Sequence, residues 1–232
     1  MERQINYFND IMKLFRTIAI LLVAAALASC APTKYVSQSD FVSIDDVAIV
    51  TPFAYVTAVE GKEGEQYSDS LSFVCSQLLA ESLASSALPA GEVIDVVFGA
   101  DEVYQSAMAS LRDVDVRKAG EALVPEPLIS LLKDNGKRYG VFTFSNGFMM
   151  DNKNYAKIVA VDALATILSI VLGGVGLYST PMKNYFTVWT AVVDSESERI
   201  VFFNTGIADG GNPTKPQHVQ KTVDHLFKDF SK

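Results

Sequence analysis

The chain has 232 residues, of which 49% are hydrophobic and 20% are charged, and its formal net charge is −8. Without residues 1–29, which hold three basic and two acidic residues, 16 basic residues remain against 25 acidic ones, a net charge of −9. This balance repels phosphate backbones and excludes nucleic acid as a partner, and the length suits one domain.

A basic start and a short apolar run open the chain. Lys13 and Arg16 precede the apolar residues Ile18–Leu27. A membrane-spanning helix needs about 20 apolar residues, so this shorter run predicts a secretory signal instead. Residues 1–11 carry two acidic residues, which a signal does not favour at its start, and we therefore expect Met12 to be the initiator.

The end of the apolar run reads Leu27, Ala28, Ser29 and Cys30. These residues resemble the lipobox of bacterial lipoproteins, in which a bulky apolar residue and two small ones precede the cysteine that receives the lipid. The resemblance implies cleavage before Cys30 and a membrane anchor on that cysteine, where each buried methylene contributes about 0.8 kcal/mol. The alternative is a buried apolar helix that ends in a cysteine.

The residues that follow Cys30 in the chain indicate where in the cell envelope the protein is placed. Ala31, and not an aspartate, follows the cysteine, and by resemblance to enteric lipoproteins this favours transport to the outer membrane. Ala31–Gln38 contains no acidic residue, whereas some surface-displayed lipoproteins carry an acidic cluster there. We therefore expect the protein on the periplasmic face of the outer membrane.

Residues 30–46 are polar and predict a tether, and residues 47–232 predict a single α/β domain. Apolar runs predict strands, apolar stripes with a period of 3.6 predict helices, and Pro52 is expected to end the first strand before a polar loop. In chain order we expect a strand at 47–50, a helix at 70–86, a strand at 93–98, helices at 101–111 and 127–135, a strand at 139–144, a hairpin of 185–193 and 199–204, and a helix at 215–230. This order predicts a mixed sheet sandwiched by helices, with a C-terminal β-hairpin and a final helix.

Residues 158–178 are strongly apolar. Glycines interrupt the end of the segment, and its first part, Ile158–Leu172, reaches only about 22 Å as a helix. Asp162, Thr166 and Ser169 place a thin polar stripe along one side, which favours a helix packed in the core. A membrane span is one alternative. Another is a surface that touches a partner or a membrane, formed by Ile158, Val161, Leu164, Leu168 and Leu172.

No pattern of residues indicates catalysis. The sequence has no G-x-S-x-G, P-loop, H-E-x-x-H or paired C-x-x-C motif. The two histidines, His218 and His225, are interpreted as solvated helix residues because a zinc site needs further ligands. Asp209–Asn212 is interpreted as a turn and not a calcium loop, and Cys75 as a core residue with a redox role as the alternative. We therefore expect no enzyme activity, no metal and no cofactor.

Three features together resemble the lipoprotein group that includes the TolB amino-terminal domain and the curli-secretion lipoprotein CsgG. They are the opening strand Val47–Phe53 with a helix behind it, the helix-then-strand passage Leu128–Phe144, and the hairpin with Asp194 before its turn and residues 200–204 after it. The resemblance implies an α/β sandwich with assembly or scaffolding duties in the envelope. Residues 158–178 depart from it, because they are more apolar than soluble members would be.

The favoured hypothesis is a lipoprotein that acts as a non-catalytic assembly or regulatory partner of an envelope complex. Its expected partners are the membrane, through lipid on Cys30, and an envelope protein, with homo-oligomers left open. One alternative is an oligomeric secretion or pore component that uses residues 158–178. A second alternative is an envelope enzyme whose active-site pattern is not recognised.

Overall fold

A computed structural model describes residues 34–37, 44, 46–59, 64–96, 102–171, 182–228 and 230. Strand β6 (Tyr139–Met150) lies at the centre of its sheet. On one side β6 pairs antiparallel with β7 (Asn184–Asp194), which pairs antiparallel with β8 (Arg199–Asp209). On the other side it pairs in parallel with β2 (Val47–Val50) and then with β3 (Phe53–Val59).

Three short strands complete a mixed sheet of eight strands. Strand β1 (Lys34–Val36) pairs antiparallel with β8, β5 (Ala90–Ile94) pairs in parallel with β2, and β4 (Glu65–Tyr67) pairs antiparallel with β3. The helices are α2 (Asp69–Ala84), α3 (Glu102–Arg112), the 3-10 helix η3 (Val116–Glu121), α4 (Glu126–Asp134), α5 (Asn152–Val171) and α6 (Pro216–Phe227).

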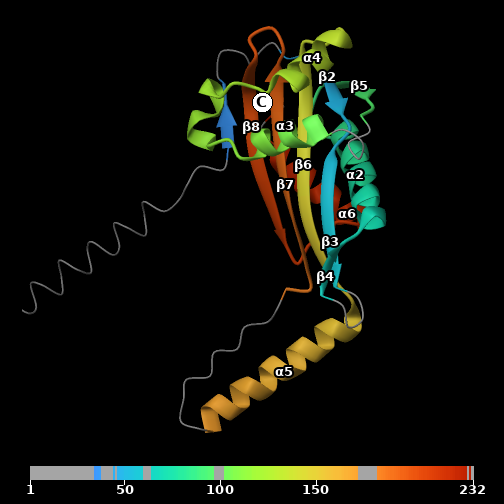
Figure 1. Cartoon of the computed structure of the whole chain (residues 1–232), viewed down its shortest axis with the longest axis vertical. Helices are drawn as coiled ribbons and strands as arrows, with labels where there is room; N and C mark the ends of the chain where they lie inside the picture. The colour runs from blue at the N-terminus through green and yellow to red at the C-terminus, as the bar shows by residue number, and fades with distance from the viewer. Residues whose placement is uncertain are drawn as a thin grey trace, which may run out of the picture. The chain divides into compact units, whose positions relative to one another are not determined.

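Helices lie on both faces of the sheet (Figure 1). Because side chains alternate between the faces of a strand, neighbouring residues of β6 belong to different cores. Val141 packs in a cluster with Leu79 of α2 and Leu226 of α6, whereas Phe142 packs in a second cluster with Met108 of α3 and with α4. This arrangement confirms the predicted mixed sheet between helices, with a C-terminal hairpin and a final helix.

A β-bulge in β8 changes which residues reach the first cluster. Val192 pairs with Phe202 while Val193 pairs with Ile200, so Val201 is an extra residue in the ladder. As a result Val201 and Phe202, which are adjacent in the chain, both lie in the core beneath α2 and α6. A regular strand would direct one of them to the opposite face.

Several strands extend beyond their predicted bounds. Strand β6 continues to Met150, and β8 continues to Asp209. Pro52 ends β2 as expected, but β3 begins directly after it, where no strand was predicted. The chain resumes pairing with β6 after the residue that lacks an N–H. Strand β1 lies within residues 30–46, predicted to be a tether, and its pairing with β8 places it in the domain instead.

Helix α5 contains the apolar segment that was predicted to pack in the core. Burial is described for residues 152–161 and 163, none of which is buried, and Val161 is 55% exposed. The prediction is therefore wrong for this part of the helix. The reason is that β6 makes its last pairing at Met150, so α5 begins where the sheet ends. Within the described part of the chain, no helix is both long enough and apolar enough to cross a membrane.

Candidate functional site

One half of the sheet carries aromatic residues on the face that α3 and α4 share. These two helices lie over the half of the sheet that contains Phe142 and Ala191 (Figure 1). The guanidinium of Arg112, the last residue of α3, lies 5.2 Å from the ring centre of Phe144. Phe144 is therefore where the part of the sheet covered by α3 ends. Beyond Phe144, alternate residues of β6 and β7 on this face are half-buried, whereas Phe186 and Val188 on the opposite face are completely buried.

Side chains from five strands meet on this half of the sheet, which we call the aromatic face. Its rings lie against each other in pairs: Tyr55 and Tyr67 have ring centres 4.8 Å apart, and those of Phe148 and Tyr185 are 5.7 Å apart. Ile207 of β8 is 68% exposed and lies opposite Thr187 of β7. The aromatic face consists of Tyr55, Tyr67, Phe148, Tyr185, Trp189 and Ile207.

The chemistry of the aromatic face is that of a binding surface. Tyr55 and Tyr67 remain 42% and 48% exposed although both are large and partly apolar. Contiguous exposed apolar groups mark surfaces that bind proteins or membranes, and tyrosine and tryptophan are enriched there because they combine apolar area with a polar group. The face is spread over five strands, so it suits a macromolecule better than an enclosed small ligand.

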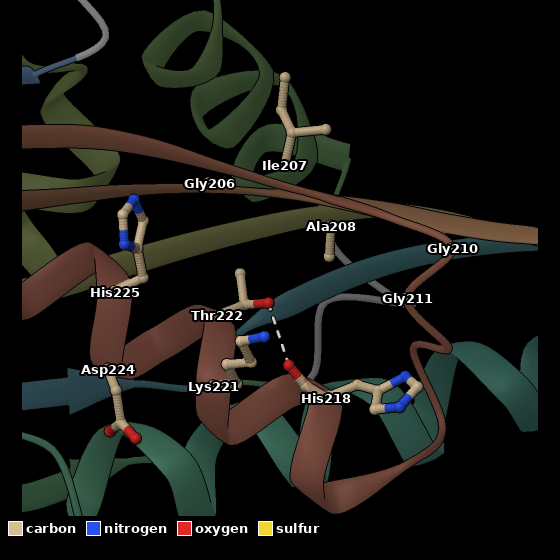
Figure 2. Close-up of a pocket in the computed structure, with 10 residues that line it drawn as sticks. All are labelled: Gly206, Ile207, Ala208, Gly210, Gly211, His218, Lys221, Thr222, Asp224 and His225. Carbon is tan, nitrogen blue, oxygen red and sulfur yellow. Dashed lines mark hydrogen bonds between the residues drawn. The ribbon is translucent and has the colours of Figure 1, made fainter.

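A groove of about 690 Å³ lies between the end of β8 and α6 (Figure 2). Its floor includes Gly206, where a Cβ atom would lie 3.1 Å from the Cγ2 of Thr222, so glycine allows the close approach of the helix. His218 Nδ1 accepts a hydrogen bond of 2.8 Å from the Asn212 backbone N–H, so this histidine is not simply solvated as predicted. His225 lies on the exposed rim, as expected.

Strand β8 separates the groove from the aromatic face. Figure 2 shows the Ile207 side chain on the opposite side of β8 from α6. Strand β1 pairs with residues 202–204 of β8, and in the described ranges no strand pairs with residues 205–209 on the side away from β7. The groove, the aromatic face and a stretch of unpaired strand edge therefore adjoin one another.

The residues predicted to carry function lie only partly within the described structure. Leu27, Ala28, Ser29, Cys30 and Leu172 lie outside the described residues, so cleavage and lipidation stay predictions. Of the proposed apolar surface, Ile158 is half-exposed, Val161 is exposed, and Leu164 and Leu168 belong to α5. The aromatic face was not predicted as a site.

The turn after β8 has the form predicted for Asp209–Asn212. Gly210 has a φ of +71°, a left-handed conformation that favours glycine, and the Gly211 N–H donates to the Ala208 carbonyl at 2.9 Å. Over the described ranges, no three His, Cys, Asp or Glu side chains are grouped so that they could hold a metal ion.

Cys75 lies in α2 and is completely buried, which confirms the prediction of a core residue. Burial raises the pKa of its thiol to about 11, although the hydrogen bond with Ser145 acts in the opposite direction. Because the thiolate is the reactive form, we expect Cys75 of the folded Cys30→Ser protein to resist a thiol reagent at about pH 8 and to react fully in urea. Ellman's reagent measures this, and rapid reaction without urea would contradict it.

Comparison with known proteins finds no matching family model and no matching curated protein. Among solved structures, the PelC dodecamer from Paraburkholderia phytofirmans is similar at 9% identity, covering 85% of this chain and 94% of that chain with a TM-score of 0.39. The LpoB C-terminal domain from Salmonella enterica is similar at 9% identity, covering 73% and 87% with a TM-score of 0.30. Scores this low do not establish a function for this chain, and the resemblance to TolB and CsgG stays a prediction.

Proposed function

We propose that the chain is a lipoprotein of the outer membrane that is anchored by lipid on Cys30, faces the periplasm and binds another envelope protein without catalysing a reaction. The observation that carries the proposal is the aromatic face. The same strands bury most of their other face beneath α2 and α6, so the partial exposure of Tyr55, Tyr67 and Ile207 leaves apolar area in contact with water. Burying that area against a partner is favourable by about 25 cal/mol per Å².

The polar groups on and beside the aromatic face favour a protein partner with its own hydrogen-bonding groups. Tyr55, Tyr67 and Tyr185 each carry a hydroxyl at the outer end of an apolar ring, and Thr187 and Thr205 lie between them on the same face. Such a surface suits an interface with an apolar centre and scattered hydrogen bonds. Such an interface supports the proposed role as an assembly or regulatory partner.

Photo-crosslinking in intact cells tests the aromatic face. A photoreactive amino acid at Ile207, which is 68% exposed, is expected to give a discrete adduct with an envelope protein. The matched control is the same amino acid at Val74 of α2, a helix that packs on the other face of the sheet; Val74 is 39% exposed. Equal adducts from both positions, or none from Ile207, would rule out this face. An adduct with a second copy of the chain would favour the oligomeric alternative.

A charge on the aromatic face is expected to weaken the contact. Tyr55→Glu places a carboxylate at the centre of the face and removes the ring that stacks on Tyr67. We expect a loss of about 1–2 kcal/mol of binding, roughly 5- to 30-fold in affinity, measured as the yield of the Ile207 adduct. Val74→Glu is the control and should leave the yield unchanged. An unchanged yield in a folded Tyr55→Glu protein would show that the partner binds elsewhere.

The anchor has its own test. Metabolic labelling with palmitate is expected to mark the wild-type chain and to leave Cys30→Ser unmarked, because only that cysteine has the lipobox before it. Cys75 cannot substitute for it, since its side chain is completely buried. Label that persists in Cys30→Ser would refute anchoring at this residue and leave binding by the aromatic face to be judged separately.

A further inference from the structure

The direction of β1 shows which end of the sheet the amino-terminal chain approaches. Strand β1 runs antiparallel to β8, with Val36 opposite Phe202 and Lys34 opposite Asn204. Followed backwards from Val36 to Lys34, the chain therefore heads toward Asp209, the last residue of β8. It does so on the same outer side of β8 on which residues 205–209 have no described strand partner.

Helix α5 begins at that same end of the sheet. Asp209 of β8 pairs with Tyr185 of β7, whose neighbour Asn184 pairs with Met149 at the end of β6. The Asp151 backbone N–H donates to the carbonyl of Val59, so the start of α5 is joined to the end of β3 as well. We call this the α5 end of the sheet.

Covalent geometry limits how far a lipid on Cys30 can be from this end. Lys34 is four positions after Cys30, so their Cα atoms lie within about 14 Å of each other in any conformation. From Asn204 to Asp209 the strand extends about 17 Å at the usual rise per residue. A lipid on Cys30 can therefore reach the side of the domain from which α5 starts.

The composition of α5 suits a membrane surface. Its first turns carry Lys153, Tyr155 and Lys157, none of which is buried, and the apolar residues follow from Ile158 onward. Lysines and tyrosines are typical of the interface between lipid head groups and water. Apolar residues are typical of the acyl region below that interface. At the start of the helix, Asp151 accepts hydrogen bonds from the backbone and side chain of Asn154.

The residues around the start of α5 continue this pattern. Lys183, just before β7, donates a hydrogen bond to the Asn152 side chain, so a third lysine lies beside the first turn of the helix. Met182 is 52% exposed, and the stacked rings of Phe148 and Tyr185 belong to the last pairs of β6 with β7. Lysine, methionine and aromatic side chains thus gather where the lipid is within reach.

We propose that α5 lies on the surface of the phospholipid bilayer that holds the Cys30 lipid and forms a second membrane contact there. The inference rests on the proposed lipid anchor. The two contacts together would fix which end of the sheet faces the membrane, whereas the lipid alone would not fix the orientation of the domain. The bilayer is the occupant because the anchor holds it within reach of α5 in every molecule.

An environment-sensitive fluorophore on Val161→Cys tests the contact in the full lipidated chain. Val161 is 55% exposed and tolerates the change, while Cys75 is buried and stays unlabelled. In vesicles of phosphatidylethanolamine and phosphatidylglycerol, we expect the emission to rise about threefold or more and to shift to the blue, as for a helix in the interface. Nitroxide-labelled lipids should quench it.

The matched control is the same fluorophore on Lys228→Cys, an exposed residue at the end of α6. We expect its emission to be unchanged by vesicles and not quenched. If the Val161→Cys probe behaves like this control in vesicles, α5 does not contact the bilayer. If its emission is already raised without lipid and depends on protein concentration, a second copy covers α5 and the proposal is overturned.

The unlipidated chain separates failure of this inference from failure of the anchor. With Cys30→Ser and excess vesicles, the Val161→Cys probe should still shift, because the contact belongs to α5 itself. That result supports the membrane contact of α5, whereas failed palmitate labelling would refute the anchor alone. The opposite result is also possible: the chain incorporates palmitate, but vesicles do not change the emission of the Val161→Cys probe in the lipidated chain. This result would refute the inference and leave the anchor intact.

Discussion

Phe202→Ala is expected to lower the free energy of unfolding by about 3–5 kcal/mol. Phe202 is completely buried, and its ring centre lies 5.4 Å from those of both Phe227 and Phe230. Removing the ring leaves a cavity between β8 and α6 that these two rings, already stacked edge to face on one another, cannot fill. Urea unfolding followed by circular dichroism measures the loss.

Phe73→Ala is the matched control for Phe202→Ala. Phe73 belongs to α2 and is 63% exposed, so its truncation should change the free energy of unfolding by less than about 0.5 kcal/mol. Equal losses from the two substitutions would contradict the packing of α6 on β8. Because α6 also forms one wall of the groove, we further expect Phe202→Ala to change the groove more than it changes the aromatic face.

Asp194→Ala is expected to cost about 2–3 kcal/mol at neutral pH, because it removes a buried carboxylate that accepts several hydrogen bonds. The Asp194 side chain is 3% exposed and accepts from Arg138 Nε and Nη2 at 3.2 Å, from the Glu196 N–H at 3.0 Å and from the Ser197 hydroxyl at 3.1 Å. These bonds hold the turn between β7 and β8 against the start of β6. Arg138 is half-exposed, which keeps the cost below that of breaking a fully buried ion pair.

The cost of Asp194→Ala should depend on pH. Burial by itself raises the pKa of Asp194, but the hydrogen bonds from Arg138, the Glu196 N–H and Ser197 outweigh it, and the pKa lies below its ordinary value of 3.8. A carboxyl group with a lowered pKa in the folded state stabilises the protein above about pH 4, and that stabilisation is lost as pH falls through the folded pKa.

Urea unfolding of the wild type and of Asp194→Ala at about pH 7 and about pH 3 measures this dependence. The difference between the two proteins is expected to be smaller at the lower pH. Asp224→Ala, which removes an exposed carboxylate bonded only to Gln220 on the same helix, should make less than about 0.5 kcal/mol of difference at either pH. A difference for Asp194→Ala that grows at low pH would contradict the assigned hydrogen bonds.

Local patterns were sufficient to predict most helices and the central strands. The stripe of α6 and the alternation along β7 follow from the sequence itself, because amphipathic periods are visible without knowledge of the partner. The bulge at Val201 could not be predicted, since it depends on the register against β7. Strand β3 was missed because Pro52 suggested a loop, and its pairing with β6 lies far away in the chain.

The candidate site was harder to predict than the fold. The alternation of Tyr185 and Trp189 with Phe186 and Val188 predicted that both faces of β7 would be at least partly covered, and the first two are indeed half-buried. Trp189 lies beside Met108 and Arg112 of α3, and the cover given to the rest of β7 depends on where α3 and α4 end, which is a property of the assembled fold. Helix α5 was predicted to be packed because its apolar composition is equally typical of a core helix and of a membrane-associated helix.

Strand β1 shields part of a sheet edge that is otherwise open. It occupies the outer side of β8 at residues 202–204, next to residues 205–209. Long unprotected edges recruit strands from other molecules, and short covering segments are a common protection against aggregation. A chain that lost residues up to Val36 would expose one uninterrupted edge from 202 to 209. Strand β1 thus also protects the protein against edge-to-edge polymerisation.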